Sequence, residues 1–221
     1  MTAASNIDIA IVAFNNMAAL DAIGPFEVLA HLPGATTHWV GLETGLVRSE
    51  ENSGVGINVD EVIEDVPRPD IVVVPGGHGE QQLRDNDRFI SWLRAAHETT
   101  TWTTSVCTGS LLLGAAGLLE GKRATSHWLA LEILETFGAS PTLERVVIDG
   151  KVITAAGVSS GIDMALTLAA EVAGSEVAQT IQLGIEYDPQ PPFDAGSPLK
   201  APQASVDLLR ASSRFLLTGQ A

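Results

Sequence analysis

The sequence predicts an α/β fold: a three-layer sandwich with a mostly parallel central sheet, flavodoxin-like, and helices on both faces. Short runs rich in Ile and Val alternate with longer segments whose apolar residues recur at helical spacing. This alternation is typical of parallel strands joined by crossover helices. Apolar residues make up 45% of the 221 residues, and no stretch in the middle resembles a linker. We therefore expect a single domain spanning residues 1–221.

Short apolar or β-branched runs in the first half of the chain predict buried strands. We place these strands at 7–14, 37–43, 70–74 and 101–106. Helical spacing of apolar residues predicts helices at 20–32, 87–97 and 108–119. Gly24-Pro25 would put a proline in the first turn of the first helix, where a missing N–H costs little. Residues 46–59 predict a hairpin or an irregular excursion.

The second half of the chain continues the alternation. Asp149-Gly150 is a strong signal for a two-residue hairpin, with strands at 143–148 and 151–154. Helices are expected at 125–137, 162–172, 177–185 and roughly 203–217. Residues 189–198 are rich in proline and predict irregular structure.

The composition excludes several classes of partner. The net charge is −15, from 27 acidic and 12 basic residues, so the basic footprint of a nucleic-acid-binding protein is absent. No apolar run reaches the ~18–20 residues of a membrane span, and the N-terminus lacks a secretory signal. The single cysteine allows no internal disulfide and suits a reducing compartment. We expect a cytoplasmic protein that binds a small molecule, with no nucleic-acid or membrane partner.

Cys107 is the candidate nucleophile. It stands directly between a strand-like run and a helix-like run, and S-V-C-T-G resembles the G-x-S-x-G spacing of a nucleophile elbow. We expect the N-terminal amides of the following helix to favour the thiolate and to lower the pKa of Cys107. The plainer alternative is an inert, buried cysteine, which is what many lone cysteines are.

Gly76-Gly77 and Asp21 also follow predicted strands. The carboxyl ends of parallel strands meet at one edge of the sheet, so we expect these residues to lie near Cys107. The two glycines would offer free N–H donors beside the sulfur, as in an oxyanion hole, or would merely form a tight turn. Asp21 would exchange a proton with substrate or water, or would merely complement the helix dipole.

His127, in T-S-H-W, is a candidate partner or substrate-binding residue. A Cys–His pair would need the ring within about 3 Å of the sulfur. A packed or surface histidine explains the residue equally well, and His78 is a weaker candidate. No His, Cys or Asp cluster has ligand spacing, so no metal is expected.

Several motifs together resemble the ThiJ/PfpI superfamily, whose fold is like that of the class I glutamine amidotransferases. They are L-D-A-I-G-P-F-E-V-L at 20–29, V-V-P-G-G-H-G at 73–79, the segment from S-V-C-T-G to T-S-H-W at 105–128, G-V-S-S-G-I-D-M-A-L at 157–166 and E-Y-D-P-Q-P-P-F-D-A-G-S-P at 186–198. The resemblance covers about residues 6–200.

Within the superfamily, C-T-G-S, T-S-H-W and P-P-F-D-A-G-S-P look most like bacterial isonitrile hydratases. This resemblance implies a homodimer that needs no cofactor and hydrates an isonitrile to an N-substituted formamide. Cys107 matches the family nucleophile, and Asp21 matches the acidic residue beside it. Thr108 matches the residue after the nucleophile, and Gly77 matches the backbone donor opposite.

One departure from the superfamily pattern argues against peptidase activity. Protease-like relatives carry His directly after the cysteine, where this chain has Thr108, so we do not expect a peptidase. Glyoxalase or deglycase chemistry on small aldehydes is the alternative enzyme class. A cysteine redox sensor or a ligand-sensing domain is the non-enzymatic alternative, although no DNA-binding module is expected here.

Overall fold

A seven-stranded sheet forms the centre of the protein. The computed structural model describes residues 6–49 and 54–215, and its main sheet has the order β10-β11-β7-β6-β1-β2-β5. The strands are β1 (Ile7–Val12), β2 (Ala35–Gly41), β5 (Glu61–Val62), β6 (Ile71–Val74), β7 (Trp102–Val106), β10 (Val146–Asp149) and β11 (Val152–Ala155). Neighbours pair in parallel except β10 with β11, which are antiparallel.

The order of the central strands is that of flavodoxin. Numbered along the chain without the two-residue edge strand β5, the parallel strands β2-β1-β6-β7-β11 run 2-1-3-4-5. Strand order reverses between β1 and β6, and ligands in such sheets bind at the carboxyl ends of the strands near that point. The predicted fold class is therefore confirmed. In this fold, a site is expected at the carboxyl ends of β1 and β6.

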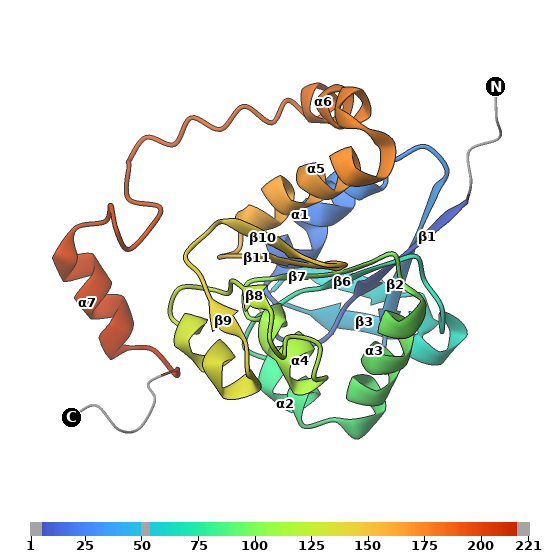
Figure 1. The fold of residues 1–221 in the computed structure, drawn as a ribbon, viewed down its shortest axis with the longest axis horizontal. Helices are drawn as coiled ribbons and strands as arrows, with labels where there is room; N and C mark the ends of the chain where they lie inside the picture. The colour runs from blue at the N-terminus through green and yellow to red at the C-terminus, as the bar shows by residue number, and fades with distance from the viewer. Residues whose placement is uncertain (1–5, 50–53, 216–221) are drawn as a thin grey trace.

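Helices cover both faces of the sheet (Figure 1). One layer holds α1 (Ala19–Leu29), α5 (Ser160–Ala173) and α6 (Ser175–Gly184), and the other holds α2 (Glu80–Arg84), α3 (Asp87–Thr99) and α4 (Gly109–Ala115). The helix α7 (Gln203–Ala211) stands apart from the sandwich at the end of a long irregular connection. Short 3₁₀ turns, η1 (Ile63–Asp65) and η2 (Leu131–Phe137), complete the helical elements of the described residues.

Burial on both faces explains why the central strands are continuously apolar. All four residues of β6 are buried, because helices lie above and below them. The helix α3 instead buries one stripe, Phe89, Trp92, Leu93 and Ala96, and its other residues are exposed or only partly buried. The continuous apolar run of β6 therefore reflects burial on both faces, and the helical spacing of apolar residues in α3 reflects burial on one face.

Both hairpin predictions are confirmed. The strands β10 and β11 flank Gly150-Lys151, one residue later than predicted, because Asp149 pairs with Val152 at the end of β10, and Gly150 has a positive φ of +63°. The antiparallel pair β3 (Gly45–Arg48) and β4 (Gly56–Val59) forms a separate small sheet, and residues 50–53 between them lie outside the described part. A third small sheet pairs β8 (Arg123–Ala124) with β9 (Ser140–Pro141).

Three element predictions need correction. The first helix begins at Ala19, so Pro25 lies inside it rather than in its first turn. Residues 125–130 are not helical, and only the short 3₁₀ turn η2 follows them. The last helix ends at Ala211, and residues 216–217 of its predicted range lie outside the described part.

The absence of a helix at residues 125–127 has a physical cause in tertiary hydrogen bonds, and residues 128–130 form a turn in which the Ala130 amide donates to the His127 carbonyl. The Thr125 amide donates to Thr154 Oγ1, and the Ser126 hydroxyl donates to the Cys107 carbonyl. These bonds replace the local bonds of a helix. In the described ranges, no helix is long and apolar enough to cross a membrane.

Candidate active site

Three segments that are far apart in the sequence meet at the carboxyl edge of the sheet. Asp21 lies in the first turn of α1, after β1. Gly76 and Gly77 follow β6, and Cys107 follows β7 directly. Because these strands are parallel neighbours, their carboxyl ends bring the three segments together, as predicted.

Cys107 occupies the sharp turn between β7 and α4. Its φ is +57°, a left-handed conformation that costs energy in any residue other than glycine. Several hydrogen bonds hold it there: its amide donates to the carbonyls of Ala155 and Ala156, and its carbonyl accepts from Ser110 and Ser126. The predicted strand–turn–helix elbow is confirmed.

Small residues are required around this turn. A Cβ at Gly109 would lie 2.1 Å from the Val74 carbonyl oxygen, and one at Gly76 would lie 2.5 Å from the Thr108 amide nitrogen. Both distances are far below a van der Waals contact. The glycines of S-V-C-T-G and V-V-P-G-G therefore let the ends of β6 and β7 approach each other closely.

Asp21 is a buried carboxyl next to the Cys107 thiol. Its side chain is fully inaccessible to solvent, and Oδ2 accepts a hydrogen bond of 2.9 Å from the Gly76 amide. Oδ1 accepts no hydrogen bond from nitrogen or oxygen of the described residues. Burial raises the pKa of Asp21 to about 7, although the Gly76 amide and the Cys107 thiol oppose that rise.

The expectation of a lowered thiol pKa is wrong. Burial, and secondly the negative charge of Asp21, raise the pKa of Cys107 to about 12. The backbone amides of Thr108 and Val158 donate to the sulfur and oppose the rise without overcoming it. Cys107 is only 5% exposed, and α4 spans just seven residues. Desolvation of the sulfur therefore outweighs the helix dipole.

The expectation that Gly76 and Gly77 offer free amides to the sulfur is also wrong. The Gly76 amide donates to Asp21, and the Gly77 amide donates to Thr108 Oγ1 at 3.0 Å. The turn instead orients the two side chains that flank the thiol. Position 77 requires glycine, because its φ is +125° and a Cβ there would lie 2.4 Å from the Ala18 amide nitrogen.

A cavity of about 370 Å³ opens above Cys107. Gly77, Thr108 and His127 line it, whereas Asp21 and Gly76 lie behind its wall. Within residues 6–49 and 54–215, no hydrogen bond joins His127 to Cys107. Its Nδ1 accepts from the Leu129 amide, and burial lowers the pKa of the ring. His127 is therefore a neutral wall of the cavity, and His78 lines the same cavity.

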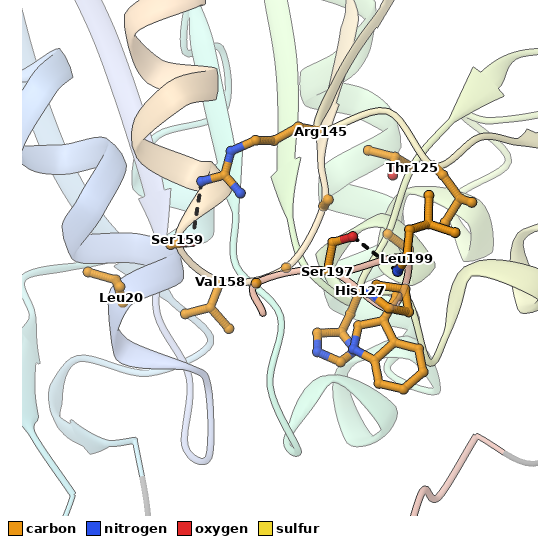
Figure 2. A pocket seen from close by; sticks show the side chains of 15 residues that line it. Leu20, Thr125, His127, Arg145, Val158, Ser159, Ser197 and Leu199 are labelled. Atoms are coloured by element: carbon orange, nitrogen blue, oxygen red, sulfur yellow. Dashed lines mark hydrogen bonds between the residues drawn. The ribbon is translucent and has the colours of Figure 1, made fainter. Parts of the chain in front are cut away.

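A second cavity of about 400 Å³ shares His127 and Val158 with the first. Figure 2 shows these two residues and Arg145, which come from three different segments, around the space. Arg145 is engaged by Asp163 at 2.5 Å and by the Ser159 hydroxyl at 3.3 Å. His127 and Val158 therefore form the partition between two adjacent cavities.

Sequence reasoning missed two residues that the structure brings to the sulfur cavity. Val158, at the turn after β11, supplies an amide to the sulfur, and β11 is the parallel neighbour of β7. The strand predicted at 151–154, in a mostly parallel sheet, was the signal that could have placed the turn after it next to the sulfur. Arg214, near the end of the chain, lines the cavity and donates to the carbonyls of Gly77 and His78. No local pattern in the sequence indicates that contact.

The arrangement defines a class: an α/β protein with a cysteine on a strained elbow, a buried carboxyl next to its thiol and a small cavity above it. Such a pair can form a covalent bond to an electrophilic carbon and move a proton. In the described ranges, no three His, Cys, Asp or Glu side chains gather as a metal site would require.

Residues 8–171 match the model of the DJ-1/PfpI family, and the chain belongs to that family. An isonitrile hydratase from Pseudomonas putida is 45% identical over 204 residues, covering 92% of this chain and 89% of that protein. A solved structure of a ThiJ/PfpI family protein from Pseudomonas syringae has a TM-score of 0.89 and 34% identity, covering 95% of this chain and 88% of that one.

The family also includes proteins of other kinds. The HTH-type transcriptional regulator CdhR of Pseudomonas aeruginosa is 30% identical over 75% of this chain, which spans 49% of that regulator. The structure of Drosophila melanogaster DJ-1beta, at 23% identity and a TM-score of 0.73, shares the fold, with 83% of this chain and 100% of that one covered.

Proposed function

We propose that this protein is an isonitrile hydratase, which converts an isonitrile and water to an N-substituted formamide. The observation that carries the proposal is the buried Cys107–Asp21 pair beneath a cavity of about 370 Å³. The 45% identity to the Pseudomonas putida isonitrile hydratase, over most of both chains, supports this choice of substrate.

The first step forms a covalent intermediate. The Cys107 thiol gives its proton to Asp21 while the sulfur bonds to the terminal carbon of the isonitrile. Asp21 then gives that proton to the same carbon, which yields a thioimidate, R–N=CH–S–Cys107. A carboxyl with a pKa of about 7 can take and return a proton near neutral pH, so the step needs no free thiolate at rest.

The second step releases the product. A water molecule adds to the thioimidate carbon, and its proton passes through Asp21 to the nitrogen. The carbon–sulfur bond then breaks as the added hydroxyl becomes the formamide carbonyl, the hydroxyl proton returns to the sulfur and the formamide leaves. One water is consumed and no electrons are transferred. The Thr108 and Val158 amides that face the sulfur stabilise its negative charge as the bond breaks, and the Thr108 hydroxyl orients the water.

Turnover of p-nitrophenyl isonitrile by the parent protein, Cys107→Ala and Asp21→Asn tests the proposal. The parent should form the formamide, and Cys107→Ala should form none while still folding. Asp21→Asn should be slower by about 10²–10⁴-fold, the usual contribution of general acid–base catalysis. Retained turnover in Cys107→Ala would exclude covalent catalysis. Methylglyoxal, assayed in parallel, should give no cysteine-dependent product; faster turnover of methylglyoxal would favour the glyoxalase or deglycase alternative.

The proposal extends to assembly and location. A homodimer is proposed from the resemblance, and large exposed apolar side chains in the last third of the chain support it: Leu183, Phe193, Leu199 and Leu208. A cytoplasmic location and the absence of a cofactor stay predictions of the sequence.

A further inference from the structure

The wall of the Cys107 cavity is built partly by the end of the chain. Leu209 of α7 and the four residues at 212–215 line the cavity together with residues that follow β6 and β7. Val206, in the same stretch of chain, is only 4% exposed. The segment 203–215, here called the C-terminal strap, therefore closes a side that the sandwich leaves open.

Arg214 fastens the strap to the turn after β6. Its Nη1 donates to the His78 carbonyl at 2.9 Å, and its Nη2 donates to the Gly77 carbonyl at 2.8 Å. The same guanidinium lies 3.4 Å from Oε1 of Glu80. The two carbonyls are 136 and 137 positions away along the chain. Arg214 is thus bonded at three points to one side of the cavity.

Glu80 is a buried carboxyl that the proposed reaction does not use. It is 1% exposed, and its Oε2 has no hydrogen-bond partner among the described residues. Burial raises the pKa of Glu80, while the charges of Arg84 and Arg214 oppose the rise. Arg214 is one of the two cations whose charge acts on this buried carboxyl, so the ionised form of Glu80 favours the strap in its docked position.

Arg214 also faces the reactive sulfur. It is the one lysine or arginine among the described residues that line the Cys107 cavity. Burial lowers the pKa of Arg214, and the negative charge of Glu80 opposes that fall. The cation that holds the C-terminal strap therefore also borders the cavity above Cys107.

We propose that Arg214 is a specificity-determining residue, which holds the C-terminal strap over Cys107 and limits the size of the molecules that reach the sulfur. We call the contacts of Arg214 with Gly77, His78 and Glu80 the latch. The size limit on molecules that reach Cys107 does not depend on the proposed function. The substrate preference does rest on it: as an isonitrile hydratase, the protein would select isonitriles with a compact N-substituent.

Labelling of the thiol tests the latch without any turnover. Cys107 is the only cysteine in the chain, so alkylation reports on this site alone. The ratio of the rate with fluorescein-5-maleimide to the rate with iodoacetamide measures access, because a change in thiol reactivity affects both reagents. Arg214→Met should raise this ratio about tenfold by favouring the undocked strap. Glu80→Gln should change it in the same direction, and the double variant should not exceed Arg214→Met.

Arg210→Met is the matched control. It removes the same charge from the same strap, but Arg210 lies outside the cavity, over Trp128. Its labelling ratio should stay within about twofold of the parent. An unchanged ratio in Arg214→Met, or an equal rise in Arg210→Met, would overturn the latch. If Arg214→Met fails to fold, Arg214→Lys replaces it. Lysine keeps the charge but cannot reproduce the forked bonds, so an unchanged ratio in that variant would likewise overturn the proposal.

Turnover separates the two parts of the inference. In Arg214→Met, kcat/KM for a naphthyl isonitrile should rise relative to kcat/KM for methyl isonitrile. If the labelling ratio rises and this preference does not, the compact-substituent part is wrong while the latch stands. If the parent turns over no isonitrile, the proposed function fails, and the labelling ratio still decides the latch.

Discussion

Cys107 and Asp21 are buried side by side, and burial makes ionisation unfavourable for both. The pKa of Asp21 rises to about 7 and that of Cys107 to about 12. Two groups this close titrate as a pair. The pair holds two protons at low pH and one proton over a wide range above about pH 7. The form with one proton is the one that can pass it between sulfur, carboxyl and substrate.

This titration predicts the pH dependence of turnover. Below about pH 7 the pair carries an extra proton on Asp21, so kcat/KM should rise about tenfold per pH unit up to about pH 7 and then level off. Initial rates with an aryl isonitrile between pH 5 and pH 9 measure this. A profile that is flat across pH 7 would contradict the assignment of Asp21 as the group that takes the thiol proton.

The same raised pKa predicts how stability changes with pH. Between the unfolded value of 3.8 and about 7, the native state keeps the Asp21 proton that the unfolded state loses, so stability falls as pH rises through this window. At 1.36 kcal/mol per unit of pKa, the loss is up to about 4 kcal/mol. Asp21→Asn lacks a titrating group and should gain up to that amount relative to the parent between pH 4 and pH 8.

Urea unfolding at both pH values measures the gain in Asp21→Asn. The control is Asp207→Asn, which removes an exposed carboxyl on α7. A pH-dependent gain that Asp207→Asn shares would not be specific to the buried carboxyl. A stability difference for Asp21→Asn that does not change between pH 4 and pH 8 would contradict the raised pKa of Asp21.

At the scale of elements, the elbow depends on the close approach of β6 and β7. A Cβ at Gly109 would lie 2.1 Å from the Val74 carbonyl oxygen, so Gly109→Ala should cost about 3 kcal/mol or more. A Cβ at Gly184, near the end of α6, would meet no described atom within 4 Å, and Gly184→Ala should stabilise by about 0.5–1 kcal/mol. Thermal and urea unfolding compare the two, and a harmless Gly109→Ala would disprove the packing account.

Several elements were predictable because their signals are local. The apolar run at 70–74 and the Asp149-Gly150 pair carry their structure in adjacent residues, and β6 and the β10–β11 hairpin confirm them. The helix expected at 125–137 was wrong at its start, because residues 125 and 126 bond to Thr154 and Cys107 instead of forming the local bonds of a helix. Those partners come from other strands, so local spacing could not reveal the competition.

The site was predictable in position and not in chemistry. Parallel strands bring their carboxyl ends to one edge, which is enough to place Cys107 near Asp21. The direction of a pKa shift depends on how deeply the group is buried, which only tertiary packing determines. The same limit explains the occupied Gly76 and Gly77 amides, whose acceptors lie on α1 and at the start of α4.

At the scale of the whole molecule, the last third of the chain exposes the large apolar side chains Phe193 and Leu199, at 78% and 79%. A homodimer would cover them, so light scattering should give about 46 kDa, twice the 23.1 kDa of one chain. Phe193→Asp with Leu199→Asp should shift the mass to one chain. Leu46→Asp, at an exposed position on β3, is the control. A parent of one chain's mass would contradict the dimer. That residues 1–221 form a single domain also stays a prediction.

The most direct test of the central claim is intact-mass spectrometry of the protein after rapid quenching with an aryl isonitrile. Both steps use Asp21, so Asp21→Asn should slow formation of the intermediate as well as its release, and the parent at short quench times is the more informative sample. A species heavier than the protein by the mass of one isonitrile should appear there, with the added mass on Cys107. It should be absent from Cys107→Ala. Formamide production with no adduct at any quench time in either the parent or Asp21→Asn, or an adduct on a residue other than Cys107, would contradict the account.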